Sequence, residues 1–254
     1  MHEKGSIKKE HAGYFALSIT QAMRDQLIQG LDLLNEVPLN LKNIATVEDL
    51  GGVYQLYVDG SPVYVGKANT SLRKRLTKHS AKLHGRSGLK DRVSFKCLYV
   101  SEDWHAIAPE KMLIDVFRQR GESPWNYNGF GNNDPGKHRD SSVVKDNHFD
   151  RVYPIDLELL LDLQISTSTT LSSIIKTIKG DLPYTFRHGA IPNVTIDAHP
   201  FAGESRSARE WFSWIASQLP REWSVVALPG YVVAYPEAVS RYPSRIDSWS
   251  SPIV

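Results

Sequence analysis

Hydrophobic residues recur at helical intervals in several stretches of the chain. In residues 14–35 the apolar positions lie three or four residues apart, which predicts an amphipathic helix. The apolar positions of this helix are Phe15, Ile19, Met23, Leu27, Leu31 and Leu34. The same spacing predicts further helices that begin near residues 71, 109, 171 and 208. Thr70 or Ser71 can cap the first of these, and Gly121 and Gly180 are expected to end the second and the third.

Runs of β-branched and aromatic residues predict strands between these helices. Residues 51–68 carry two runs rich in Val and Tyr on either side of Asp59-Gly60, a pair that favours the tight turn of a hairpin. Residues 92–100 predict a third strand, and residues 223–236 predict a second hairpin. We therefore expect an α+β (mixed) fold, built on a small sheet of about three or more strands flanked by helices.

Changes in pattern along the chain predict three regions. Residues 1–45 are expected to form an N-terminal helical arm, residues 46–150 a central domain, and residues 151–254 a C-terminal α/β extension of unknown role. Within the central domain, residues 124–140 are dense in Gly, Asn and Pro, which predicts an irregular loop. From residue 240 onward Ser, Pro and Arg dominate, so we expect this end of the chain to fray.

Composition excludes several classes of protein. Hydrophobic residues make up 41% of the chain and charged residues 23%, which is typical of globular proteins. No stretch reaches the ~20 apolar residues that span a bilayer, and no apolar run near the start indicates a secretory signal. The single cysteine, Cys97, excludes internal disulfides and a multi-cysteine zinc site, and a cytoplasmic location is expected. Motifs for nucleotide phosphates or for a serine nucleophile are missing, so no nucleotide cofactor is expected.

Positive charge is concentrated in one part of the chain. The formal net charge is only +2, but ten Lys or Arg lie between Lys67 and Lys96, where Asp91 is the only acid. These ten are Lys67, Arg73, Lys74, Arg75, Lys78, Lys82, Arg86, Lys90, Arg92 and Lys96. Such a block is typical of a surface that faces phosphates, although a solvated helix face is the alternative interpretation.

Candidate chemistry gathers around the first hairpin and the helix that follows it. Tyr54 lies on the first strand and Tyr64 on the second. Arg75 and His79 are four residues apart, so they share one face of the next helix, which we expect to turn toward the hairpin. Glu110 lies in the first turn of a later helix. Taken alone, a strand tyrosine is better explained by packing, a helical Arg or His by surface exposure, and a Glu in a first helical turn by the helix dipole. The combination of these residues in this order is what indicates a functional site.

The motifs in this region resemble the GIY-YIG nuclease superfamily. The resemblance is carried by GVY, a short hairpin, YVGKA, the spacing RxxxH and a later helical Glu, with Val in place of Ile in both name-giving triplets. The stretch APEKMLIDVF, PWN and GFGNNDPG also resembles the type II restriction endonuclease branch. By this resemblance the catalytic residues are Tyr54, Tyr64, Lys67, Arg75, His79, Glu110 and Asn126.

The resemblance implies hydrolysis of DNA phosphodiester bonds with one divalent metal per site. Glu110 is expected to hold Mg²⁺, for which Mn²⁺ can substitute, and Arg75 is expected to stabilise the transition state. Tyr54 is expected to activate water, with its pKa lowered by Lys67, the metal and Arg75. His79 is the alternative base, or a relay for the proton of Tyr54.

The expected substrate is double-stranded DNA with a palindromic site, cut by a homodimer of a restriction-modification system. Phosphate and base contacts are predicted for Arg73, Lys74, Lys78, Lys82, Arg86, Asn132, Lys137 and Arg139. The glycine-rich loop that carries the last three can alternatively serve only the fold. Two other functions stay open: a repair or mobile-element nuclease that nicks one strand, and a catalytically silent DNA-binding module.

Overall fold

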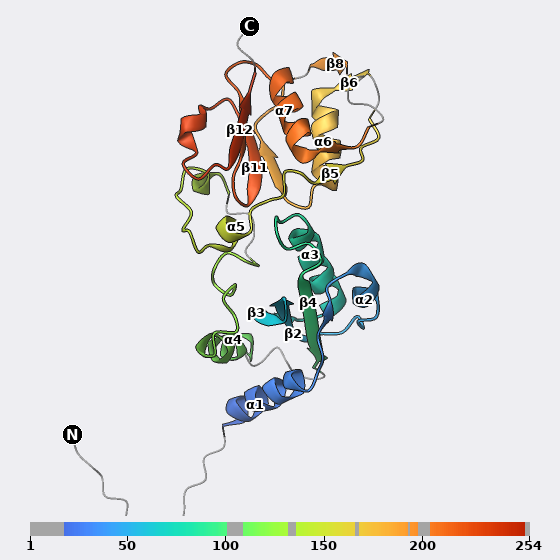
Figure 1. Ribbon diagram of the computed structural model, residues 1–254, viewed down its shortest axis with the longest axis vertical. Helices are drawn as coiled ribbons and strands as arrows, with labels where there is room; N and C mark the ends of the chain where they lie inside the picture. Colours follow the sequence, from blue (N-terminus) through green and yellow to red (C-terminus); the bar gives the residue numbers. More distant parts are fainter. Residues whose placement is uncertain are drawn as a thin grey trace, which may run out of the picture.

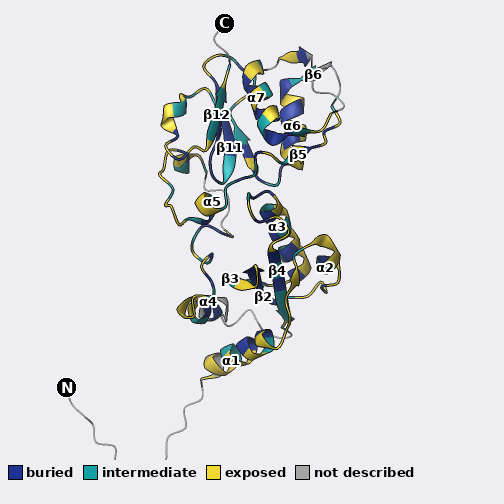
Figure 2. Cartoon of the chain, in the orientation of Figure 1, coloured by how far each residue is buried: buried dark blue, intermediate teal, exposed yellow. Residues whose placement is uncertain are grey.

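The protein is built from two α+β lobes, each with its own four-stranded sheet (Figure 1). The computed structural model describes residues 18–100, 109–131, 136–165, 168–192, 194–197 and 204–251. The N-terminal lobe contains the sheet β1-β4-β2-β3, and the C-terminal lobe contains the sheet β12-β10-β11-β7. The predicted α+β class is confirmed, and both sheets have buried inner faces (Figure 2).

The N-terminal sheet is antiparallel throughout. Its strands are β1 (Val37–Pro38), β2 (Gly52–Val58), β3 (Ser61–Ala68) and β4 (Val93–Tyr99). Asp59 and Gly60 connect β2 to β3 with positive φ angles of 48° and 78°, which is the geometry of a tight hairpin turn. A bulge near Leu56 and Tyr57 shifts the register, so that Tyr54 pairs with Gly66 and Leu56 pairs with Tyr64.

Helices cover both faces of this sheet. The helices are α1 (Ile19–Asp32), α2 (Leu41–Ala45), α3 (Leu72–His84) and α4 (Pro109–Gln119). Tyr54 and Leu56 pack with the leucines of α3 on one face, whereas Val53 packs with α1 and α4 on the other. Ser71 caps α3 by accepting a hydrogen bond from the Lys74 N–H at 3.1 Å.

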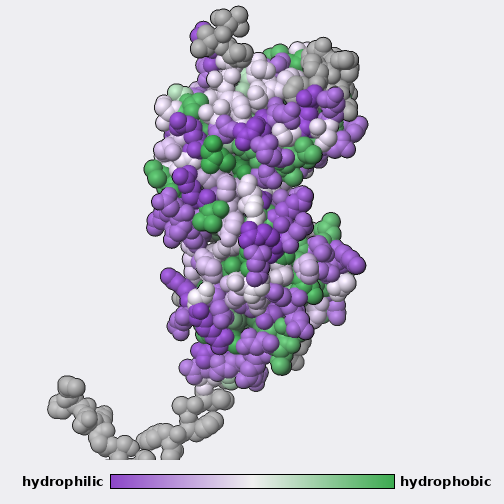
Figure 3. All heavy atoms as spheres, in the orientation of Figure 1, coloured by the Kyte–Doolittle hydropathy of each residue, from purple (hydrophilic) through white to green (hydrophobic). Residues whose placement is uncertain are grey.

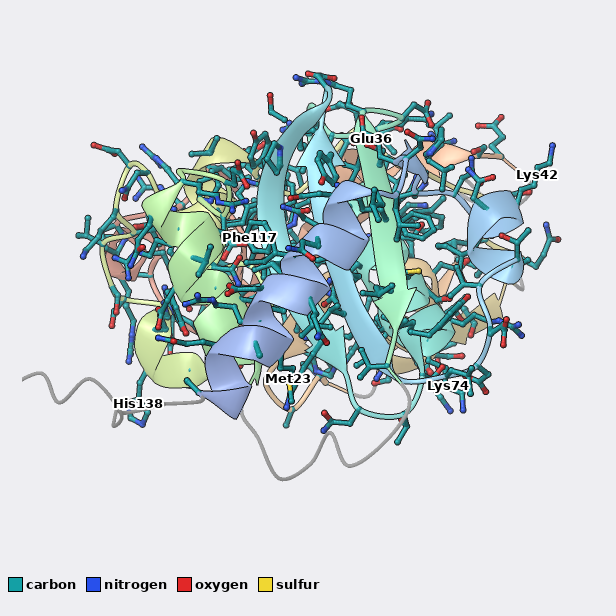
Figure 4. All side chains as sticks on the ribbon, turned by 90° about the horizontal axis from the view of Figure 1, so that it is seen from below. Met23, Glu36, Lys42, Lys74, Phe117 and His138 are labelled. Carbon is teal, nitrogen blue, oxygen red and sulfur yellow. The ribbon has the colours of Figure 1, made fainter. Side chains whose placement is uncertain are left out.

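The prediction of a separate N-terminal arm is wrong for residues 18–45. Leu27, Ile28 and Leu31 are buried against Val53 and the apolar side of α4. Figure 4 shows α1 lying across the strands of the sheet. Since β1 also pairs with β4, this segment belongs to the core of the N-terminal lobe. The first part of the predicted helix, residues 14–17, lies outside the described residues.

The C-terminal lobe packs two helices on its sheet. Its strands are β7 (Thr185–His188), β10 (Ser224–Ala227), β11 (Tyr231–Tyr235) and β12 (Asp247–Ser250), of which β7 and β11 run parallel. The helices α6 (Leu171–Asp181) and α7 (Ala208–Gln218) bury their apolar sides against this sheet. Shorter elements complete the lobe or precede it: α5 (Phe149–Val152), β5 (Leu160–Leu161), β6 (Ser168–Thr170), β8 (Thr195–Asp197), β9 (Arg206–Ser207), and the 3₁₀ turns η1 (Lys137–Arg139) and η3 (Val239–Arg241).

The predicted fraying after residue 240 is wrong through residue 251. Tyr242 is 1% exposed, and its hydroxyl donates a hydrogen bond to Glu237 at 2.8 Å. The strand β12 pairs with β10 along its whole length. A tail rich in Ser, Pro and Arg is therefore held by pairing with a distant strand.

The buried side chain of Arg86 joins the two lobes through an ion pair and hydrogen bonds. Arg86 follows α3, is 4% exposed, and forms an ion pair with Asp150 at 2.9 Å. Its Nη1 also donates to the carbonyl oxygens of Tyr153 and Pro229. The prediction that Arg86 contacts DNA is therefore wrong, because its guanidinium is buried between the lobes and is committed to protein acceptors.

Candidate active site

The first hairpin places Tyr54 and Tyr64 on the face of the sheet that α3 covers. The centroids of the two rings lie 6.0 Å apart. Tyr54 pairs across the hairpin with Gly66, and a Cβ added at Gly66 would lie 2.5 Å from the Tyr54 hydroxyl oxygen. The glycine of the second triplet therefore makes room for the Tyr54 ring.

The α3 helix brings Arg75 and His79 to the same point. His79 Nε2 lies 2.7 Å from the Tyr54 hydroxyl oxygen, and Arg75 Nε donates to that oxygen at 3.2 Å. Tyr54, Tyr64, Arg75 and His79 thus lie together, whereas the side chain of Glu110, the carboxylate predicted to join them, lies outside the described residues. The side chains of Arg75 and His79 both turn toward the hairpin as expected, and His79 is only 4% exposed.

Phe130 is a site residue that sequence reasoning missed. Its ring stacks on His79 with centroids 4.9 Å apart and meets the edge of Tyr64 at 4.8 Å. The loop that carries it was expected to enter a DNA groove, yet this part of the loop packs inward. A large aromatic residue between two glycines was the available signal, because an exposed loop rarely needs one.

Burial changes the acid–base properties of the site. Burial, followed by the neighbouring Tyr64, raises the pKa of Tyr54, and Arg75 only partly opposes this. Burial, Arg75 and Lys82 lower the pKa of His79 to about 3. The protein's own groups therefore raise the Tyr54 pKa on balance, and the expected lowering would need the charge of a bound metal ion beside Arg75. At neutral pH the Tyr54 hydroxyl therefore shares its hydrogen bond with Nε2 of a neutral His79, and the tautomer of the ring decides which of the two donates.

A cationic cavity of about 440 Å³ opens beside Arg75. Lys67 lines it from the end of β3, and Lys74 and Lys78 line it from α3. Residues 68–71 complete the wall, and none of the described lining residues is acidic, although Asp49 lies next to it, 3.9 Å from Lys74 Nζ and hydrogen-bonded to Ser71. Arg75 is half-buried, so it links this cavity to the buried tyrosines and His79 beneath it. The arrangement suits an anion that contacts Arg75 from the cavity side.

Asn126 forms two hydrogen bonds with the strand β3, which carries Tyr64. Its side-chain oxygen accepts from the Val65 N–H at 3.0 Å, and its side-chain nitrogen donates to the Val65 carbonyl at 2.9 Å. Val65 lies between Tyr64 and Gly66, so Asn126 fixes the strand that carries the second tyrosine. The geometry assigns Asn126 a positioning role.

The predicted metal ligand is Glu110. Glu110 lies in the first turn of α4, and its side chain lies outside the described residues. Later turns of α4 bury Leu113 and Phe117 on the face of the sheet opposite α3. No group of three or more His, Cys, Asp or Glu side chains gathers in the described parts of the chain. A single carboxylate completed by waters and phosphate oxygens suffices for Mg²⁺, so Glu110 remains the predicted ligand.

The remaining predicted DNA contacts lie in different environments. Arg73 donates from Nε to the Val47 carbonyl at 2.6 Å, which joins α3 to the loop between α2 and β2. Lys137 forms an ion pair with Glu237 at 3.0 Å. Lys82 and Arg139 line a second cavity between the lobes, whereas Asn132 lies outside the described residues. Only Lys74 and Lys78 of the predicted phosphate contacts therefore share the cavity beside Arg75.

Comparison of the chain with protein-family models and with curated proteins gives no match. Among the residues that the structure describes, no helix combines the length and the apolar character needed to cross a membrane. The nuclease interpretation therefore stands on the residues and their geometry.

Proposed function

We propose that the protein is a metal-dependent endonuclease that cuts double-stranded DNA at specific sites, as the resemblance to the type II branch of the GIY-YIG superfamily implies. The observation that carries the proposal is the position of Arg75. Its guanidinium contacts the buried Tyr54 hydroxyl on one side and lines a cationic cavity on the other. A phosphate in that cavity would meet a planar donor group that is held in place from below.

Phosphodiester cleavage gives each cationic side chain near the cavity a role. Negative charge grows on the phosphoryl oxygens in the transition state, and Arg75 with Lys67 supplies fixed positive charge there. Glu110 would hold Mg²⁺, which as a Lewis acid stabilises the leaving oxygen. The surrounding lysines, Lys74 and Lys78, hold the strand through its neighbouring charges.

Tyr54 and His79 are close enough to exchange a proton, next to the guanidinium of Arg75. The Tyr54 hydroxyl shares a hydrogen bond with neutral His79, and its oxygen accepts from Arg75 Nε. The 2.7 Å contact permits the relay, in which Tyr54 takes a proton from water as it passes its own to His79. A pKa of about 3 makes buried His79 a weak proton acceptor, so Tyr54 stays the proposed water activator and the relay the alternative. Tyr54 is fully buried, so water reaches it only when the covering side chains move.

Cutting both strands of a palindromic site requires two active sites, and a C₂ homodimer is the simplest arrangement. The proposal includes a cytoplasmic location, which fits a chain with a single cysteine.

Incubation with supercoiled plasmid and phage DNA in the presence of Mg²⁺ tests the proposal. We expect linear plasmid and discrete phage fragments, and we expect Glu110→Gln to abolish both while DNA binding persists. Lys90→Gln is the control, because Lys90 is exposed and lines neither the cavity beside Arg75 nor the cavity between the lobes. Open-circular product alone would indicate the strand-nicking alternative, and binding without any product would indicate a silent DNA-binding module.

A further inference from the structure

A second cavity, of about 450 Å³, lies between the two lobes and is also cationic. Lys82 and Arg86 line it from the N-terminal lobe, Arg139 from η1 and Lys179 from α6. Asp150 is the one carboxylate of the described chain in its wall, and this carboxylate is paired with Arg86. Three cations therefore remain without a carboxylate in the lining, which favours an anionic ligand.

Lys82 is the cation with the most unused hydrogen-bonding capacity. Its ammonium nitrogen lies 5.2 Å from the ring centroid of Phe130 and 5.6 Å from that of Phe149. In the described part of the chain this ammonium makes no hydrogen bond or ion pair, although it carries three N–H donors. Burial, and next the charge of Arg86, lower the pKa of Lys82 to about 8, so it is still mostly protonated at pH 7.

Lys179 lines the same cavity from the other lobe. It is exposed, and its only described polar contact is His188 at 3.5 Å, the limit of a hydrogen bond. The two lysines thus line one cavity from different lobes, and neither forms an ion pair in the described part of the chain, although the charge of Asp150 acts on Lys82. A protein that only needed to join its lobes would place a carboxylate between them, as it does between Arg86 and Asp150.

The helix α3 connects this cavity to the site at Arg75. Arg75, His79 and Lys82 are spaced by four and three residues, so they follow one face of the helix. Seven residues of helix separate Arg75 from Lys82, which corresponds to ~10 Å at about 1.5 Å per residue. Each strand of a duplex carries one charge per ~3.4 Å of axis, so this length matches roughly three phosphates. On the face that Figure 3 shows, the outline is indented between the lobes, and many side chains that border the indentation are hydrophilic.

We propose that the interlobe cavity binds a backbone phosphate of the same duplex that is cut at Arg75, through Lys82 and Lys179. The inference rests on the proposed nuclease function, and it gives the C-terminal lobe a role in holding DNA that flanks the cleavage site.

The test is the salt dependence of binding to a fluorescent duplex of mixed sequence, measured without divalent metal so that no cleavage occurs. Lys82→Gln and Lys179→Gln are each expected to lower the slope of log affinity against log salt by about 0.9, because each removes one phosphate contact. Lys176→Gln is the matched control, because Lys176 is exposed on the same helix as Lys179 and does not line the cavity. Thermal unfolding of each variant confirms that it is folded.

Unchanged slopes in both variants would overturn the inference. Thermal unfolding with added inorganic phosphate separates the two sources of the ligand. Stabilisation by phosphate that Lys82→Gln and Lys179→Gln abolish, together with unchanged slopes, would assign the cavity to a free phosphate compound instead of DNA. Cleavage by the wild-type protein is measured in parallel, so that failure of the inference with cleavage intact leaves the nuclease proposal standing.

Discussion

Lowering the pH from 7 to 5 is expected to destabilise the protein through His79. The folded protein holds this ring neutral, because burial, Arg75 and Lys82 lower the pKa of His79 from 6.5 to about 3. In the unfolded chain the ring takes up a proton near its ordinary pKa of 6.5. Between pH 6.5 and about 3 the unfolded state therefore binds more protons, and the free energy of unfolding falls as the pH falls.

The size of the effect follows from the two pKa values. Stability from His79 is complete above pH 6.5, and each pH unit below it removes up to about 1.4 kcal/mol. From pH 7 to pH 5 the loss is about 2 kcal/mol. This is a large share of the ~5–15 kcal/mol that holds a typical domain folded.

Urea denaturation of the wild-type protein and of His79→Gln at pH 7, 6 and 5 measures this loss. Other groups also titrate, including His148, whose pKa is lowered mainly by burial. They are common to both proteins, so the difference between the two pH profiles isolates His79. Tyr54→Phe serves as a second control: it removes the 2.7 Å hydrogen bond but keeps His79 buried, so its pH profile is expected to follow the wild type.

Parallel pH profiles for the wild type and His79→Gln would refute this reasoning. If His79→Gln does not fold, an NMR titration of the wild-type ring gives the same answer. The ring is expected to stay neutral at pH 5, and a protonated ring at that pH would contradict the buried environment that the structure describes.

Three further changes test other contacts. Gly66→Ala is expected to lower both cleavage and stability, because its Cβ would lie 2.5 Å from the Tyr54 hydroxyl; plasmid cleavage and thermal unfolding measure this. Asn126→Ala is expected to cost ~1–3 kcal/mol in urea denaturation, because the paired backbone groups of β3 lose their partners. Arg86→Met is expected to cost about 3–5 kcal/mol by the same assay, because it leaves Asp150 between the lobes without its cation. Wild-type stability in any of these variants would contradict the corresponding contact.

Local patterns in the sequence were sufficient to predict that Tyr54, Arg75 and His79 lie close together. The turn pair Asp59-Gly60 fixes the hairpin, and the cap at Ser71 fixes the start of α3. Helical spacing then places Arg75 and His79 on one face. Each of these features depends on residues that are close in sequence, so the rules of turn geometry, helix capping and helical periodicity are enough to predict it.

Contacts between distant parts of the chain were not predictable in this way. Phe130 lies far from His79 in the sequence, and its contact depends on how a loop folds back over the sheet. Arg86 belongs to a basic run that is typical of a DNA-binding surface, yet the second lobe buries it. The complete burial of Tyr54 has the same origin, because it depends on what covers the hairpin.

Single-turnover cleavage by Arg75→Lys tests the central claim most directly. Lysine keeps the positive charge that attracts DNA but lacks the planar donor group that the Tyr54 hydroxyl holds in place. With enzyme in excess over a cleavable duplex and Mg²⁺ present, we expect the rate to fall by roughly 10²-fold or more while DNA affinity stays close to that of the wild type. A wild-type cleavage rate in Arg75→Lys would contradict the claim that this guanidinium, fixed between the buried tyrosines and the cationic cavity, stabilises the transition state.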